Sequence, residues 1–170
     1  MVTRIGVIGT GMMGCEHIRN VDANPNAVIT AISDPNEEPR EWARHALGAD
    51  NSVAEFRDHR DLLKSGEVDA VVVASPNFTH HALLLDILQT DTPVLVEKPM
   101  CTTVEHCQDV VALAQQRNAL TWVGLEYRYM TPIARLLDVV NSGELGDVKM
   151  LSIREHRFPF LQKVNNWNLH

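Results

Sequence analysis

The chain has 170 residues, of which 45% are hydrophobic, and its formal net charge is −7. This length and apolar content suffice for a domain of ordinary size with a substantial core. Because an acidic chain repels phosphodiester backbones and anionic lipid surfaces, the composition argues against nucleic acid and membranes as partners.

Short apolar runs rich in β-branched residues alternate along the chain with segments of helical periodicity. We expect strands at 4–9, 27–33, 69–75, 93–98 and 120–124, with a weaker one at 52–56. The intervening segments predict helices at 12–21, 37–47, 59–66, 80–90 and 103–118. Such regular alternation is typical of βαβ units, which build a parallel sheet covered on both faces. The predicted fold class is therefore α/β, with a Rossmann-type doubly wound parallel sheet.

The pattern changes after Gly124. An amphipathic helix is expected at 131–143, followed at 147–158 by a longer alternating segment that is typical of an edge strand. We therefore predict two domains: a dinucleotide-binding domain at 1–124, and at 125–170 the start of an incomplete substrate or oligomerisation domain.

The first strand is followed by a glycine-rich turn with the spacing GxGxxG. Gly9 allows the tight turn, Gly11 lets the backbone approach a pyrophosphate, and Gly14 lets the helix pack closely on the strand. The free N–H groups at the start of that helix favour an anion. We therefore predict that the loop binds a dinucleotide through six residues: Gly9, Thr10, Gly11, Met12, Met13 and Gly14.

An acidic residue, Asp34, follows the second strand, twenty residues after Gly14. A carboxylate at this point can bind both ribose hydroxyls and repels a 2′-phosphate, which favours NAD over NADP. Arg40 lies six residues later, within the next predicted helix. The alternative interpretation is a plain tight turn in which Asp34 caps the residues that follow it.

The segment SPNFTHH follows the buried strand at 69–75. Ligands of open parallel sheets gather at the carboxyl ends of the strands, so this turn is expected to face the same crevice as the glycine loop. Pro76 fixes the turn, and Asn77 could cap the next helix or bind the cofactor. His80 and His81 point in different directions on a helix and no further ligand completes the set, so we expect no metal site.

The segment VEKPM follows the next strand, at 96–100. Lys98 lies where this strand reaches the crevice, between Glu97 and the rigid Pro99, and a lysine there could assist the removal of a substrate proton. An ordinary surface lysine beside Glu97 is the alternative interpretation.

The cysteines are sparse: Cys15, Cys101 and Cys107 form no CxxC pair and no disulfide framework. The amino-terminal segment is broken by glycines and has no cleavage site typical of a signal peptide. No window approaches 18 consecutive apolar residues, the length typical of a membrane span. Together these features predict a cytoplasmic protein.

In this order, GTGMMG, Asp34, SPNFTHH, EKP and EYRY resemble the glucose–fructose oxidoreductase and inositol dehydrogenase (Gfo/Idh/MocA) family. The resemblance covers nearly the whole chain, and the EKP turn is its most specific motif. It implies a Rossmann domain that binds NAD or NADP. It also implies a second α/β domain, which carries a sugar or polyol site and commonly the interface of a homo-oligomer.

The resemblance also assigns roles to individual residues. It implies that Lys98 is catalytic and that Glu97 contacts the nicotinamide ribose. It places Asn77 and His80 along the cofactor crevice and Arg128 near the nicotinamide or the substrate. Ser75 and Pro76, in the turn before Asn77, are added to these. The predicted cofactor contacts outside the glycine loop are therefore Asp34, Ser75, Pro76, Asn77, His80, Glu97 and Arg128.

The sequence departs from the family in the second domain. Family members run to roughly twice this length and carry an acidic residue and a histidine, spaced i and i+4, that assist the EKP lysine. Here Asn166 and His170 have that spacing, but asparagine cannot act as a base. We therefore expect the chain to hold the cofactor half and to lack the catalytic histidine and most of the substrate site.

Three functions remain open from the sequence. The first is an NAD-dependent oxidoreductase that acts on a sugar or polyol, with hydride transfer to nicotinamide. The second is a truncated or non-catalytic NAD-binding module. The third keeps the Rossmann fold but reduces an imine or a biliverdin-like tetrapyrrole.

Overall fold

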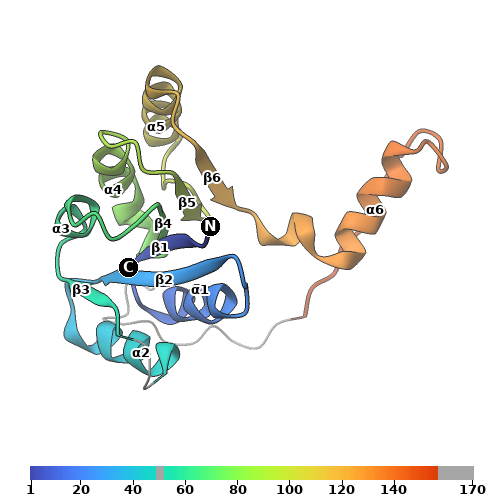
Figure 1. Ribbon diagram of the computed structural model, residues 1–170. Helices are drawn as coiled ribbons and strands as arrows, with labels where there is room; N and C mark the ends of the chain where they lie inside the picture. The colour runs from blue at the N-terminus through green and yellow to red at the C-terminus, as the bar shows by residue number, and fades with distance from the viewer. Residues whose placement is uncertain (49–51, 157–170) are drawn as a thin grey trace. The chain divides into compact units, whose positions relative to one another are not determined.

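The computed structural model describes residues 1–48 and 52–156. The chain divides into two units, Met1–Gly124 and Leu125–His170. The first unit contains a six-stranded sheet with the strand order β3-β2-β1-β4-β5-β6, in which all neighbouring strands run parallel (Figure 1). This is the order of a Rossmann-type sheet, so the predicted fold class is confirmed.

The strands are short, as expected for a small parallel sheet. They are β1 (Thr3–Ile8), β2 (Ala27–Ser33), β3 (Ala54–Phe56), β4 (Ala70–Val73), β5 (Val94–Glu97) and β6 (Thr121–Gly124). The helices between them are α1 (Met12–Asp22), α2 (Glu37–Leu47), α3 (His59–Lys64), α4 (His80–Ile87) and α5 (Val104–Arg117). A 3₁₀ turn, η1 (Asn77–Thr79), precedes α4.

The helices form two layers, with α1 and α2 on one face of the sheet and α3, α4 and α5 on the other (Figure 1). Successive residues of a strand point to opposite faces, so Val7 packs toward α1 and α2 while Ile8 packs in the other core. The core beneath α1 and α2 includes the buried side chains Val7, Ile18, Ile29, Ile32 and Ala43. The larger core beneath α3, α4 and α5 includes Leu62, Val71, Val73, Leu84, Ile87, Leu88, Val96 and Val110.

Local chemistry accounts for where several helices begin and end. The hydroxyl of Thr103 accepts a hydrogen bond from the His106 backbone N–H at 3.2 Å, which caps α5. Asp58 caps α3 in the same way, through the Arg60 N–H. At the far end of α5, Asn118 takes the left-handed conformation that commonly ends a helix.

The second unit begins with a 3₁₀ turn, η2 (Glu126–Tyr129), and continues into α6 (Thr131–Asn141). Pro132 lies in the first turn of α6, and Gly143 follows its end with a φ of 78°. The expected strand over 147–158 is wrong for residues 147–156, which form no strand. A strand needs a hydrogen-bonding partner, and the described part of this unit supplies none. The last two residues of the expected strand lie outside the described residues.

No helix within residues 1–48 and 52–156 has the length and apolar character needed to cross a bilayer.

Candidate functional site

Because the six strands run in one direction, their carboxyl ends share one edge of the sheet, where the sequence motifs converge. The glycine loop follows β1, Asp34 follows β2, Ser75 lies just beyond β4, and Glu97 is the last residue of β5. The Gly9 N–H donates to the Ser33 carbonyl at 2.7 Å, which links the ends of β1 and β2. This edge is where ligands of doubly wound sheets bind.

Each glycine of the loop meets a different local constraint. Gly9 has a φ of 87°, and a Cβ there would lie 2.5 Å from the Ser75 backbone nitrogen. At Gly14 a Cβ would lie 2.1 Å from the Gly9 carbonyl oxygen, so α1 packs directly on the turn. A Cβ at Gly11, by contrast, would meet nothing within 4 Å. The open space at Gly11 and the crowding at Gly14 fit the roles expected of a pyrophosphate loop.

Asp34 connects the end of β2 to the glycine loop. Its Oδ2 accepts the Thr10 backbone N–H at 3.0 Å, and its Oδ1 accepts the Asn36 N–H at 2.9 Å. Only 8% of Asp34 is exposed. Oδ1 also accepts the side-chain N–H of Asn36 at 3.4 Å. Each carboxylate oxygen can accept two hydrogen bonds, so Oδ2 retains capacity for a ribose hydroxyl.

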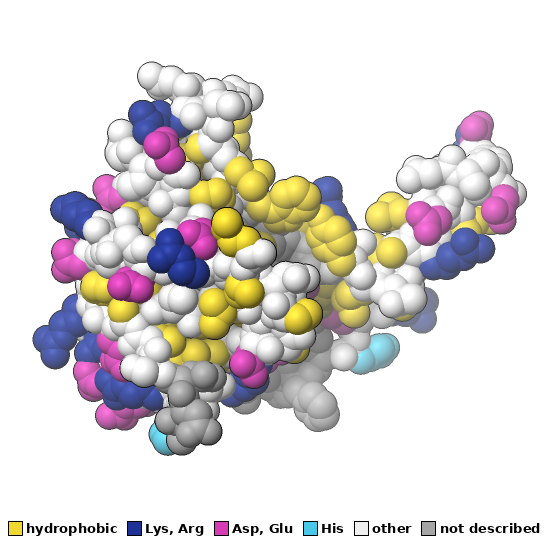
Figure 2. All heavy atoms as spheres, viewed as in Figure 1, with side chains coloured by type: hydrophobic (Ala, Val, Ile, Leu, Met, Phe, Trp, Pro, Cys, Tyr) yellow, Lys and Arg dark blue, Asp and Glu magenta, His cyan; other side chains and the backbone are white. Residues whose placement is uncertain are grey.

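Arg40 lies on α2 and is almost fully buried. Its guanidinium donates to the backbone carbonyl of Asp34 and to the carboxylate of Glu37. Basic and acidic side chains lie next to one another over the region of α2, where Arg44 pairs with Glu37 and Glu55 (Figure 2). Arg40, the first arginine after Asp34 in the sequence, thus donates its hydrogen bonds to protein acceptors and not to a 2′-phosphate. This agrees with the preference for NAD.

Two features of the glycine loop show whether a dinucleotide would fit there. The Thr10 hydroxyl is buried, and within the described part of the chain it has no hydrogen-bond partner. A buried hydroxyl without a partner is costly, and an incoming polar group can satisfy it. Together with the open space at Gly11, this makes the loop suitable for an anionic group. Met12 and Met13, in the first turn of α1, are both exposed.

The turn after β4 is held by its own side chains. The Ser75 hydroxyl lies 2.7 Å from that of Thr79, and Asn77 begins η1, which Pro76 precedes. Asn77 is therefore at the start of a turn, and it does not cap α4, whose N-cap is Thr79. The roles of Ser75, Pro76 and Asn77 in cofactor binding stay predictions.

His80 is 1% exposed and joins two of the loops at this edge. Its Nδ1 lies 2.9 Å from the Pro99 carbonyl oxygen and its Nε2 lies 3.0 Å from the Ser75 carbonyl oxygen. Both ring nitrogens thus face protein carbonyls. The expected cofactor contact of His80 stays a prediction, and its observed contacts connect the β4 turn with the turn that carries Lys98.

Glu97 is bound by a residue that the sequence analysis missed. Its Oε1 lies 2.8 Å from Nε2 of His17, on α1, and its Oε2 accepts the Lys98 backbone N–H at 3.2 Å. A signal was present in the sequence: His17 comes three residues after Gly14, the glycine packed closest to the turn, and so lies on the same face of α1. The expected contact of Glu97 with the nicotinamide ribose stays a prediction.

Lys98 is exposed at the end of β5, and its peptide bond with Pro99 is cis. This location at the ligand-binding edge is the one that the sequence predicted. Arg128 belongs to the second unit, within η2. Asn166 and His170 lie outside the described residues. The catalytic role of Lys98 and the cofactor contact of Arg128 stay predictions.

The environment of Glu97 predicts a measurable pH effect. Burial acts to raise the pKa of Glu97, but the His17 hydrogen bond and the Lys98 N–H outweigh it, so the pKa lies below the ordinary value of 4.5. A carboxylate with a lowered pKa stabilises the fold above its unfolded pKa, and this contribution is lost as the pH falls through the folded pKa. We expect the ¹³C resonance of the Glu97 carboxyl to titrate with a midpoint below 4.5. A midpoint above that value would contradict the hydrogen-bonding pattern.

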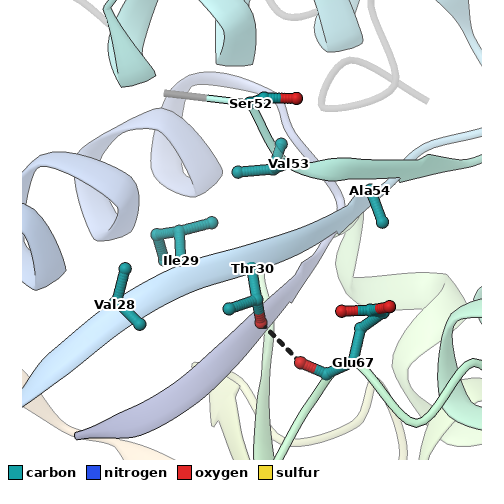
Figure 3. A pocket seen from close by; sticks show the side chains of 7 residues that line it. All are labelled: Val28, Ile29, Thr30, Ser52, Val53, Ala54 and Glu67. Atoms are coloured by element: carbon teal, nitrogen blue, oxygen red, sulfur yellow. Dashed lines mark hydrogen bonds between the residues drawn. The ribbon is translucent and has the colours of Figure 1, made fainter. Parts of the chain in front are cut away.

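A surface hollow lies at a different part of the fold. It is lined by Val28, Ile29, Thr30, Ser52, Val53, Ala54 and Glu67 (Figure 3). The side chain of Thr30 points toward the Glu67 backbone carbonyl and donates to it at 2.7 Å. The hollow is near the beginning of β2, whereas Asp34 follows the end of that strand, so it is separate from the candidate site.

Within residues 1–48 and 52–156, no group of three His, Cys, Asp or Glu side chains could hold a metal ion. His81, which the sequence placed beside His80, packs its ring against His106 with 3.9 Å between the ring centroids.

The chain resembles known inositol dehydrogenases in sequence. It is 38% identical over 157 residues to inositol 2-dehydrogenase 2 of Saccharopolyspora erythraea, covering 89% of this chain and 44% of the relative. It is 35% identical over 150 residues to inositol 2-dehydrogenase 1 of the same organism, covering 86% and 44%. The chain thus spans less than half the length of the curated relatives it matches.

A solved structure agrees with these matches. The myo-inositol dehydrogenase of Lactobacillus casei, solved in complex with NAD(H) and myo-inositol, superposes with a TM-score of 0.79 at 32% identity. The similarity covers 86% of this chain and 43% of that enzyme. Residues 3–125, which contain the glycine loop, Asp34 and the Lys98 turn, match the model of an oxidoreductase family with an NAD-binding Rossmann fold. The chain therefore belongs to the Gfo/Idh/MocA oxidoreductase family.

Proposed function

We propose that this chain is the cofactor-binding part of an NAD-dependent dehydrogenase that oxidises a hydroxyl group of a cyclic polyol such as an inositol. The observation that carries the proposal is the convergence of the glycine loop, Asp34 and Lys98 at the carboxyl edge of one parallel sheet. The relatives named as inositol dehydrogenases support the substrate class.

Under this proposal different residues of the chain bind the cofactor and transfer the proton. The backbone N–H groups at the start of α1 bind the pyrophosphate, and Asp34 binds the adenosine ribose and excludes a 2′-phosphate. NAD, when bound, supplies the acceptor for the hydride that leaves the substrate carbon. The Nζ of Lys98 accepts the proton of the substrate hydroxyl as that carbon is oxidised.

The second unit belongs to the same proposal as the start of a substrate and association domain. None of the α6 residues is buried, and Leu137 is 44% exposed. Such a helix could be covered by further protein of the same chain or of a second copy, so a homo-oligomer is part of the proposal. A cytoplasmic location, favoured by the sparse cysteines, is part of it as well.

The test is an assay of NADH formation at 340 nm with myo-inositol, scyllo-inositol and glucose. The chain is assayed by itself and as a chimera in which residues 1–124 are joined to the remaining part of an inositol 2-dehydrogenase relative. We expect NAD-dependent oxidation of an inositol by the chimera. An intact chimera that binds NAD but oxidises none of these polyols would refute the substrate class.

The assay also separates the enzyme from a binding module. The chain spans 44% of its first relative, so more than half of that relative has no counterpart in these residues. NAD binding by the chain without turnover, together with turnover by the chimera, would show that the unit supplies the cofactor half of the reaction. Reduction of an imine by the chimera, with no polyol oxidation, would favour a different reductase activity.

A further inference from the structure

The turn that carries Lys98 is held from both faces of the sheet. His17 comes from α1, on one face, and reaches Oε1 of Glu97 at 2.8 Å. His80 comes from α4, on the other face, and lies 2.9 Å from the carbonyl oxygen of Pro99. The residues immediately before and after Lys98 are therefore each bound by a histidine.

The contact with His17 reaches Lys98 itself through one carboxylate. While Oε1 of Glu97 faces His17, Oε2 of the same side chain accepts the backbone N–H of Lys98 at 3.2 Å. Only 20% of the His17 side chain and 12% of the Glu97 side chain are exposed, so solvent screens the pair weakly. Hydrogen bonds to a charged group are also stronger than those between neutral groups. Fixing the carboxylate therefore fixes the backbone at Lys98.

The helix that supplies His17 is the one that begins at the glycine loop. Gly11 is the N-cap of α1, and its carbonyl accepts the Cys15 N–H at 2.9 Å, two residues before His17. Gly14 packs against the Gly9 carbonyl, so the start of α1 and the loop move together. A hydrogen-bonded helix transmits a displacement over so short a distance with little loss.

We propose that His17 is a positioning residue that couples the glycine loop to the orientation of Lys98. A dinucleotide at the loop fixes the start of α1, α1 fixes His17, and His17 fixes the Glu97 carboxylate that holds the Lys98 backbone. This inference rests on the proposed role of Lys98 in the reaction. It adds a specific path by which a dinucleotide bound at the glycine loop fixes the orientation of Lys98.

The proposal requires a particular chemical state of His17. Glu97, as a carboxylate, only accepts hydrogen bonds, so Nε2 of His17 must carry the proton. Long-range ¹H–¹⁵N NMR of the His17 imidazole ring in the unmodified chain shows directly which ring nitrogen carries the proton. A signal from a protonated Nε2 is expected at neutral pH, and a ring protonated only at Nδ1 would overturn the proposal without any variant.

The variants His17→Gln and His17→Leu test the coupling. Glutamine retains an N–H donor that can reach the carboxylate, whereas leucine removes it. His45→Leu, at an exposed histidine on α2, is the matched control. Amide hydrogen exchange is followed at Lys98, at the glycine loop and at Val72 in the core, with and without saturating NAD.

We expect the exchange rate of the Lys98 amide to rise by about tenfold in His17→Leu, while Val72 exchanges as in the parent chain. NAD should slow exchange at Lys98 in the parent chain and in the control variant, but much less in His17→Leu. His17→Gln should recover part of this effect. A role confined to overall stability would instead raise exchange at Val72 to the same extent.

The result separates this inference from the proposed function. If NAD protects no amide of the glycine loop in the parent chain, the proposed function fails. If NAD protects that loop, but Lys98 exchanges alike in the parent chain and His17→Leu, only the coupling is overturned. Should His17→Leu fail to fold, the ring NMR of the unmodified chain still decides, because a ring protonated only at Nδ1 overturns the proposal by itself.

Discussion

The Gly14→Ala variant is expected to unfold with a free energy about 3 kcal/mol lower than that of the parent chain, and to bind NAD poorly. The added Cβ would lie 2.1 Å from the Gly9 carbonyl oxygen. That oxygen belongs to the backbone of a tight turn, so it cannot move aside as a flexible side chain would. Urea unfolding monitored by circular dichroism measures the loss.

The same substitution three residues earlier is the control. Gly11 has a φ of −66°, which alanine adopts without strain, and a Cβ there would meet nothing within 4 Å. Gly11→Ala should therefore keep the parent stability to within about 0.5 kcal/mol. It should nevertheless bind NAD at least about tenfold more weakly, because the methyl group occupies the space that a pyrophosphate needs. Unchanged NAD affinity in Gly11→Ala would show that the loop does not hold the dinucleotide.

Replacing Lys98 should remove most turnover and leave NAD affinity intact. In the chimera with a complete second domain, Lys98→Ala should lower kcat by a factor of about 10² to 10⁴, the usual contribution of a general base. The side chain is exposed at the end of β5 and is no part of either hydrophobic core, so the fold should tolerate the change. Steady-state kinetics together with an NAD titration measure both quantities.

Two further variants separate proton transfer from charge. Lys98→Arg keeps the positive charge, but a guanidinium does not release its proton in proteins, so this variant should be nearly as inactive as the alanine variant. Lys64→Ala, at an exposed lysine on α3, should keep parent activity. If Lys98→Arg retained most of the turnover, Lys98 would act through its charge and the proposed proton transfer would be wrong.

Apolar periodicity predicted the fold well, because the strands of a parallel sheet buried on both faces are short continuous apolar runs that are visible in the sequence. The bounds of β2 and α2 agree with those expected from the sequence alone. The strand expected over 147–158 shows the limit of such patterns. Alternation tells which residues could share a face, but a strand also needs a neighbour, and residues 147–156 have none in the described part of the chain.

The candidate site was predictable where it depends on position after a strand, and not where it depends on contacts between distant residues. Asp34 and Lys98 follow strands, so the sequence located them. The pairing of His17 with Glu97 joins residues 80 positions apart. The three-residue spacing from Gly14 places His17 on the face of α1 toward the turn, but it does not reveal Glu97 as the partner.

The central claim is that residues 1–124 hold NAD through the glycine loop and Asp34, and calorimetric titration of the chain with NAD and NADP tests it most directly. The Asp34 carboxylate, whose Oδ2 accepts one hydrogen bond and can accept a second, and the buried Arg40 predict that NAD binds at least about tenfold more tightly than NADP. Asp34→Ser, which removes the charge and keeps a small polar side chain, should reduce this preference. Binding of NADP as tight as that of NAD, or no binding of either, would contradict the account.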